Sequence, residues 1–204
     1  MDPKMSAARQ KQPSTGSSTG APSAATPAAG RWLLLVYRVP SEPTRLRATV
    51  WRRLKGLGAI YLQNAAAALP ANAASERALR LLRNEIVDMS GTAVLLSCEV
   101  LAGGADVMEA FQAARDDEYE EIIDRCRDFE AGLQKEYVAE HFTYPELEEN
   151  DVDLVKLQQW FAKVGDRDVF GAAGRAAAEK ALEVCAHRLE EYAARVYAEE
   201  GEGH

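Results

Sequence analysis

Five cationic side chains lie within one short segment of this sequence: Arg45, Arg47, Arg52, Arg53 and Lys55. Cations this close together suit contacts with phosphate groups, because each one can neutralise a phosphate charge. The surrounding residues 31–70 hold seven basic side chains and one acidic side chain, a net charge of +6, although the whole chain carries −8. Residues 99–204 hold 11 basic and 27 acidic side chains, or −16. The segment is therefore a candidate anion-binding surface, or a solvated helix whose cations pair with the acidic half.

The hydrophobic pattern predicts that these cations lie on an amphipathic helix that ends near Gly56-Leu57-Gly58. Ser41 or Glu42 is the expected N-terminal cap. One face of the helix is apolar and is formed by Leu46, Val50, Leu54 and Leu57. The opposite face carries Arg45, Arg52 and Lys55, with Arg47 and Arg53 on the flanks and Trp51 at the border.

The elements around this helix predict a ferredoxin-like module over residues 31–102. A β-rich run at 32–39 precedes the helix, and two short strands at 59–62 and 65–69 follow it across a Gln63-Asn64 turn. A second helix at 74–89, stopped by Gly91, leads to a strand at 92–100. The order βαββαβ is that of the split βαβ fold, in which two helices cover one face of a four-stranded sheet. The other face is then free for a partner.

The remaining ordered part, residues 103–200, predicts an antiparallel three-helix bundle. Three apolar stripes recur at helical spacing, from Tyr119 to Leu133, from Leu147 to Val164 and from Leu182 to Val196. The connections between them are short, as in helical bundles. Residues 1–30 are rich in Ala, Ser, Thr, Pro and Gly and are expected to form a disordered tail. The fold class is thus α+β.

Other kinds of chemistry find little support in the residue pattern. The many carboxylates of the helical half include no Glu-x-x-His pair of the di-iron type, so a solvated face is expected, with no metal and no cofactor. Arg167-Asp168 fits a hydrogen-bonding link between helices better than an acid–base pair. The three cysteines lack zinc spacing, and Cys126 and Cys185 fall on apolar stripes as reduced thiols. No signal peptide or membrane-spanning run is present, which favours the cytoplasm.

Three long stretches of the chain resemble the N-terminal domain of the ChrB-type chromate-resistance regulators. They read WLLLVYRVPSEPTRLRATVWRRLKGLGAIYLQN, FTYPELEENDVDLVKLQQWFAKVGDRDVFGA and VCAHRLEEYAARVYA, within residues 31–198. The resemblance implies a transcriptional regulator of a chromate-efflux operon that binds double-stranded DNA. It also implies that Arg45, Arg47, Arg52, Arg53 and Lys55 contact the DNA.

A more distant resemblance links residues 31–102 to a domain of the phenylacetate-degradation repressor PaaX and to CRISPR-associated ferredoxin-fold nucleases. It implies a homodimer in which the sheets of two copies face one another. Those nucleases place a metal-binding aspartate at the end of the first strand, where this chain has Arg38. A cation there would repel Mg²⁺, so nuclease activity is disfavoured.

Two expectations follow from how this chain departs from its relatives. ChrB-type regulators usually continue into a second domain that responds to chromate, and this sequence stops at His204. We therefore expect either a shortened regulator that works alone or sensing supplied by a separate sensor-domain protein or a missing segment. The alternative functions are a metal- or oxyanion-dependent enzyme, with its site between sheet and bundle, and a protein-interaction module whose basic helix docks on an acidic partner.

Overall fold

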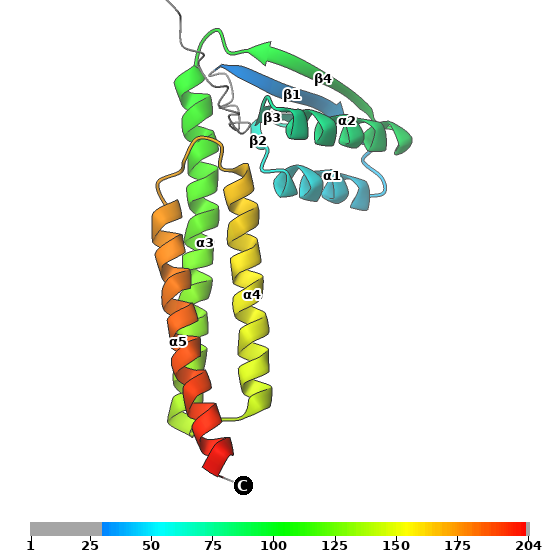
Figure 1. Cartoon of the computed structure of the whole chain (residues 1–204). Helices are drawn as coiled ribbons and strands as arrows, with labels where there is room; N and C mark the ends of the chain where they lie inside the picture. The colour runs from blue at the N-terminus through cyan, green and yellow to red at the C-terminus, as the bar shows by residue number, and fades with distance from the viewer. Residues whose placement is uncertain (1–29, 203–204) are drawn as a thin grey trace, which may run out of the picture.

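A computed structural model describes residues 30–202 of the protein, which form an α+β structure with a four-stranded antiparallel sheet and five helices (Figure 1). The α+β prediction is confirmed at this level. In chain order the elements are β1 (Arg31–Arg38), α1 (Arg45–Gly56), β2 (Ile60–Gln63), β3 (Ala66–Pro70), α2 (Ala73–Asp88), β4 (Thr92–Glu99), α3 (Gly104–Ala139), α4 (Tyr144–Arg167) and α5 (Arg175–Glu202). Apart from Gly30, the predicted disordered tail lies outside the described residues.

The sheet has the strand order β2-β3-β1-β4, and each neighbouring pair is antiparallel. Side chains alternate between the two faces of a strand, so Leu33 and Leu35 share one face of β1. Both are buried, together with Val50 and Leu54 of α1 and Leu79 of α2. Figure 1 shows both helices on the same side of the sheet. The apolar stripes of the two helices therefore form the core of this half.

The alternate side chains of β1 and β4 form a surface that is partly exposed. Val36 lies opposite Val94 and Leu34 lies opposite Leu96 in the β1–β4 register. Val36, Val94 and Leu96 are 43%, 56% and 44% exposed. Adjacent large apolar side chains on an open sheet face are typical of an interaction surface. We call Leu34, Val36, Val94 and Leu96 the open sheet face.

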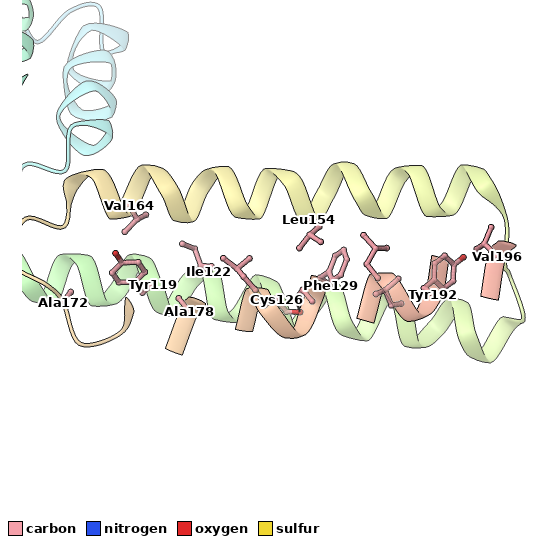
Figure 2. Close-up of a cluster of buried hydrophobic side chains, with 14 of the residues drawn as sticks. Tyr119, Ile122, Cys126, Phe129, Leu154, Val164, Ala172, Ala178, Tyr192 and Val196 are labelled. Carbon is pink, nitrogen blue, oxygen red and sulfur yellow. Dashed lines mark hydrogen bonds between the residues drawn. The ribbon is translucent and has the colours of Figure 1, made fainter. Parts of the chain in front are cut away.

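The helices α3, α4 and α5 pack side by side, and successive helices run in opposite directions (Figure 1). Figure 2 shows Tyr119, Ile122 and Cys126 of α3 directed toward a core that Val164 of α4 closes at one end. The stripe predicted for α5 is buried throughout, and so is the stripe predicted for α3. In α4 only Leu154 and Val164 are fully buried, while Leu147, Leu157 and Phe161 are partly buried.

Residues beyond 103 also pack against the sheet. The ring of Trp32 in β1 lies 5.9 Å from that of Phe111 in α3 and 6.0 Å from that of Phe170, and the two phenylalanine rings are 5.5 Å apart. Aromatic rings at these separations attract one another beyond the area that they bury. The three rings join the helical region, residues 104–202, to the sheet.

Two predicted element boundaries are wrong in detail. Neither Ser41 nor Glu42 caps α1; its N-cap is Thr44, whose backbone is already helical and whose side chain makes no capping hydrogen bond. The hairpin turn is formed by Asn64 and Ala65 rather than by Gln63 and Asn64. Ala65 has a φ of 65°, and a β-bulge between Tyr61 and Gln63 shifts the register by one residue. A β-bulge without a glycine cannot be recognised from residue types, so this bulge was not predicted.

Candidate nucleic-acid interface

The helix α1 presents all five predicted cations to solvent. Val50 and Leu54 are fully buried beneath it, and Leu46 and Leu57 are half-buried beside them. These contacts fix the rotation of α1 about its own axis, because turning the helix would expose its apolar side chains to water. The exposed side chains are Arg45, Arg47, Arg52, Arg53 and Lys55, as the sequence predicts.

The five cations differ in what surrounds them. At 100° per residue, Arg45, Arg52 and Lys55 point away from the buried side of α1. Within residues 30–202 none of these three side chains forms an ion pair; the Arg52 Nε donates to the Ala48 carbonyl, and the Lys55 Nζ lies 5.6 Å from the centre of the Trp51 ring. We call Arg45, Arg52 and Lys55 the outward row.

The two flanking arginines face different neighbours. Arg53 faces α2, where its Nη2 lies 2.8 Å from Glu85 Oε1. The Arg53 side chain remains 62% exposed, so this ion pair contributes little to stability. Arg47 lies on the opposite flank and lines a cavity together with Trp51 and Tyr61. In the described part of the chain, no cation of α1 pairs with a carboxylate of the helical region.

Two arginines of the helical region contact the backbone at the C-terminal end of α1, at Gly56, and just beyond it, at Gly58. Arg115 Nη1 in α3 donates to the Gly58 carbonyl at 2.9 Å, and Arg167 Nη1 at the end of α4 donates to the Gly56 carbonyl at 2.9 Å. The last carbonyls of a helix lack partners within the helix and carry partial negative charge, so cations there are favourable. These two contacts, the arginine clamp, fix where α1 lies relative to the helical region.

Acidic side chains balance the arginine clamp. Glu118 Oε2 lies 2.8 Å from Arg167 Nη2 and 3.3 Å from Arg115 Nε. Burial lowers the pKa of the Arg115 guanidinium, and the charge of Glu118 opposes this effect. Asp168 accepts hydrogen bonds from the Tyr119 hydroxyl, at 3.2 Å, and from the Ala172 amide. Burial, with the nearby charge of Asp168, raises the pKa of Tyr119 to about 12, so the phenol stays a neutral donor.

Gly58, between α1 and β2, is required where the two arginines of the clamp contact the backbone. Its φ is +75°, and a β-carbon there would lie 2.4 Å from Arg115 Nη1 and 2.8 Å from Arg167 Cδ. Only glycine accommodates both the left-handed backbone and the close approach of two arginines. From the sequence alone, this glycine was predicted only to end a helix.

The arginine clamp was not predicted from the sequence, although the sequence contains one signal for it. Arg115 lies four residues after Phe111 and four before Tyr119, on the stripe that α3 buries. A cation at such a position must find partners inside the protein. The prediction that Arg167-Asp168 is a hydrogen-bonding link between helices is confirmed by the contacts to Gly56, Glu118, Tyr119 and Ala172.

The region between sheet and helices was the predicted place for an alternative enzyme site. A cavity of about 350 Å³ lies there beside Leu57, Phe111 and Arg167. The two terminal nitrogens of Arg167 are bonded to the Gly56 carbonyl and to Glu118, and among the described residues its Nε is buried without a hydrogen-bond partner. Within residues 30–202 no group of three or more His, Cys, Asp or Glu side chains is placed to hold a metal ion.

Membership of a family follows from a comparison of the sequence with known proteins. The family model described as "Protein ChrB, N-terminal" matches residues 47–203, which are 157 of the 204 residues. The chain belongs to the ChrB N-terminal family. The predicted resemblance is therefore confirmed, and the match includes most of α1, both arginines of the clamp and the whole helical region. No curated protein sequence matches the chain.

Membership of this family indicates a protein that is like the chromate-resistance regulators. It does not identify any residue that contacts DNA. The part of the chain that the structure describes contains no helix long and apolar enough to cross a membrane.

Proposed function

We propose that the protein is a transcriptional regulator of the ChrB type that binds double-stranded DNA through α1. The observation that carries this proposal is the outward row, three exposed cations without a carboxylate partner among residues 30–202. A helix of 12 residues is about 18 Å long, and its width suits the major groove of DNA. Membership of the ChrB family supports a role in chromate resistance.

The charge distribution also supports binding of DNA through α1. Residues 99–204 carry a net charge of −16, so the helical region repels phosphate while α1 attracts it. The arginine clamp holds α1 at one end of that acidic region (Figure 1). A polyanion is thereby steered toward one surface of the molecule.

The test of this proposal is the salt dependence of binding to duplex DNA taken from upstream of the protein's own gene. Replacing Arg45, Arg52 and Lys55 together by Ala is expected to weaken binding at least about tenfold and to reduce the slope of log K against log salt by about 2.7, because about 0.9 is lost per phosphate contact. Fluorescence anisotropy at several salt concentrations measures both quantities.

A matched control separates contact from overall charge. Lys135, Lys163 and Lys180 are exposed on the helical region, and their replacement by Ala removes the same three charges. The control variant should keep the wild-type slope. Equal slopes for wild type and the α1 variant, or equal losses in both variants, would contradict the proposal.

We further propose that the protein is a cytoplasmic homodimer in which the open sheet faces of two copies meet. The exposed side chains of Val36, Val94 and Leu96 support this arrangement, since a partner sheet would bury them. The open sheet face lies on the side of the sheet opposite α1, so a dimer would leave both copies of α1 accessible (Figure 1). Two related α1 helices would then suit a palindromic DNA site.

Chromate sensing is assigned in this proposal to a separate sensor-domain protein. The support is that Arg115, which is buried, and Arg167, which is partly buried, already have carbonyl and carboxylate partners. We also infer that the sheet half is a ferredoxin-like module and that the helical region is a three-helix bundle. The element order βαββαβ and the strand order β2-β3-β1-β4 support the first assignment. The shared core of α3, α4 and α5 supports the second.

A further inference from the structure

A second candidate site lies beside α1, on the flank where the outward row ends. An open cavity of about 610 Å³ is lined by the end of β1, one side of α1 and the β2–β3 hairpin. We call it the Trp51 pocket. The lining side chains that matter to the argument are Tyr37, Arg38, Arg47, Trp51, Tyr61 and Asn64.

The pocket displays aromatic rings that the fold does not bury. Trp51 is 50% exposed and Tyr61 is 41% exposed, whereas Trp32 is only 5% exposed. The hydroxyl groups of Tyr37 and Tyr61 lie 3.3 Å apart and hydrogen-bond, which holds the Tyr61 ring in place. Burial and this hydrogen bond raise the pKa of Tyr61, so the phenol is neutral. Exposed, positioned rings provide surfaces on which a planar group can stack.

The same pocket is electropositive. Arg38 and Arg47 line it, and no acidic side chain does. Within residues 30–202 neither arginine forms an ion pair; Arg47 Nη2 donates only to the Ser41 carbonyl, at 3.3 Å. Each guanidinium therefore has donors left for an anion, and arginine binds phosphate through two parallel hydrogen bonds. Asn64, in the turn, adds an amide that can both donate and accept.

A planar ring, a negative charge and polar ring edges together describe a nucleotide. We propose that the Trp51 pocket binds one unpaired nucleotide, with its base against Trp51 and Tyr61 and its phosphate at Arg38 and Arg47. In a duplex the bases are stacked on one another and cannot reach these rings, so this activity is separate from phosphate contacts along the outward row. The nucleotide comes from single-stranded nucleic acid or from a free mononucleotide, and the experiment distinguishes these sources.

The experiment measures binding of the full-length protein to a labelled strand of twelve thymidines by fluorescence anisotropy. Replacing Trp51 by Ala is expected to weaken binding about tenfold, since stacking of one base on an aromatic side chain contributes on that scale. Trp51→Phe keeps a ring and should retain most of the affinity. An abasic strand of the same length should bind wild type and Trp51→Ala equally, because it lacks the stacking group.

Two controls make the result decisive. Tyr197→Ala removes an aromatic side chain that is 60% exposed on α5, far from the pocket, and should leave binding unchanged. Circular dichroism shows whether the Trp51→Ala variant is folded. If it is not, the test uses wild type and Trp51→Phe instead, and the affinity of each for the thymidine strand is compared with its affinity for the abasic strand. Equal affinity of the thymidine and abasic strands for wild type would overturn the proposal, as would an unchanged affinity in a folded Trp51→Ala variant.

Competition with thymidine monophosphate identifies the source of the nucleotide. Displacement of the labelled strand by the free nucleotide supports a mononucleotide ligand, and binding of the strand without displacement supports single-stranded nucleic acid. The triple Ala variant of the outward row separates this site from the proposed function. Its duplex binding should be weakened, while the difference in affinity between the thymidine and abasic strands should remain.

Discussion

Arg115 and Arg52 carry the same guanidinium but lie in opposite environments. Arg115 is 3% exposed and donates to the Gly58 carbonyl beside Glu118, whereas Arg52 is exposed and donates only to a carbonyl of its own helix. Removing a partner from a buried charge lowers the free energy of unfolding far more than the intact ion pair raises it. The contacts of Arg115 are therefore needed for stability. Its role is to position α1, while Arg52 remains available to an external anion.

Replacing Arg115 by Met tests the clamp. The variant leaves the Gly58 carbonyl without its donor and Glu118 with Arg167 alone, so the free energy of unfolding should fall by about 3 kcal/mol. Urea denaturation followed by circular dichroism measures the change. Arg125→Met is the control, because Arg125 pairs with Asp128 at the surface and its loss should cost less than about 1 kcal/mol. Equal losses in both variants would show that burial adds nothing to the role of Arg115.

At the scale of elements, packing decides where helices and strands end. The second helix was predicted to run to residue 89 and to be stopped by Gly91. The helix α2 ends one residue earlier, at Asp88, and Ser90 takes the left-handed conformation with a φ of 63°. Gly91 instead lies against the end of β1. A β-carbon there would be 2.6 Å from the Arg38 carbonyl oxygen and 2.8 Å from Ile86 Cγ2. The glycine is therefore needed for the close approach of two chain segments.

A pair of glycine substitutions tests this interpretation. Gly91→Ala should lower the free energy of unfolding by about 1–3 kcal/mol, since backbone atoms must move apart. Gly132→Ala, inside α3 with nothing within 4 Å of the added carbon, should raise it by about 0.5–1 kcal/mol. Thermal and urea unfolding report both changes. A neutral Gly91→Ala would mean that β1 and the α2–β4 turn are not closely packed.

In the whole molecule, the proposed binding surfaces lie on opposite sides of the sheet. Figure 1 shows α1, which carries the outward row and lines the Trp51 pocket, on one side of the sheet. The side chains of the open sheet face alternate with the buried ones along β1 and β4 and therefore point to the other side. In Figure 1 the acidic helical region extends from the sheet on the same side as α1 and α2. DNA binding and self-association can therefore occur together without competing for the same residues.

The proposed homodimer is tested by charging the open sheet face. Val36→Lys with Val94→Lys should convert a dimer into a monomer, because a symmetric contact would place four buried lysines together. Sedimentation velocity at micromolar concentration measures the mass. Val152→Lys with Val184→Lys, at similarly exposed positions of the helical region, is the matched control and should leave the dimer intact. A monomeric wild-type protein, or a charged variant that remains dimeric, would contradict the proposal.

Much of this fold could be predicted because its signals are local. The exposed cations of α1 and the buried stripe from Tyr119 to Leu133 repeat at the helical period, which neighbouring residues set among themselves. The same reasoning failed at the Asn64-Ala65 turn, where an alanine takes a conformation usual for glycine or asparagine. The position of this turn depends on the bulge in β2, and no local sequence pattern predicts that bulge.

The family, the α+β class and the charged side of α1 could all be predicted from the sequence. What each cation contacts is known only from the folded chain, because such contacts join residues far apart in the sequence. Arg115 and Gly58 are 57 positions apart, and Arg167 and Gly56 are 111 apart. The Trp51 pocket likewise exists only where β1, α1 and the β2–β3 hairpin meet. Five cations that look alike in the sequence are thereby separated into an outward row, an ion pair with α2 and one wall of a pocket.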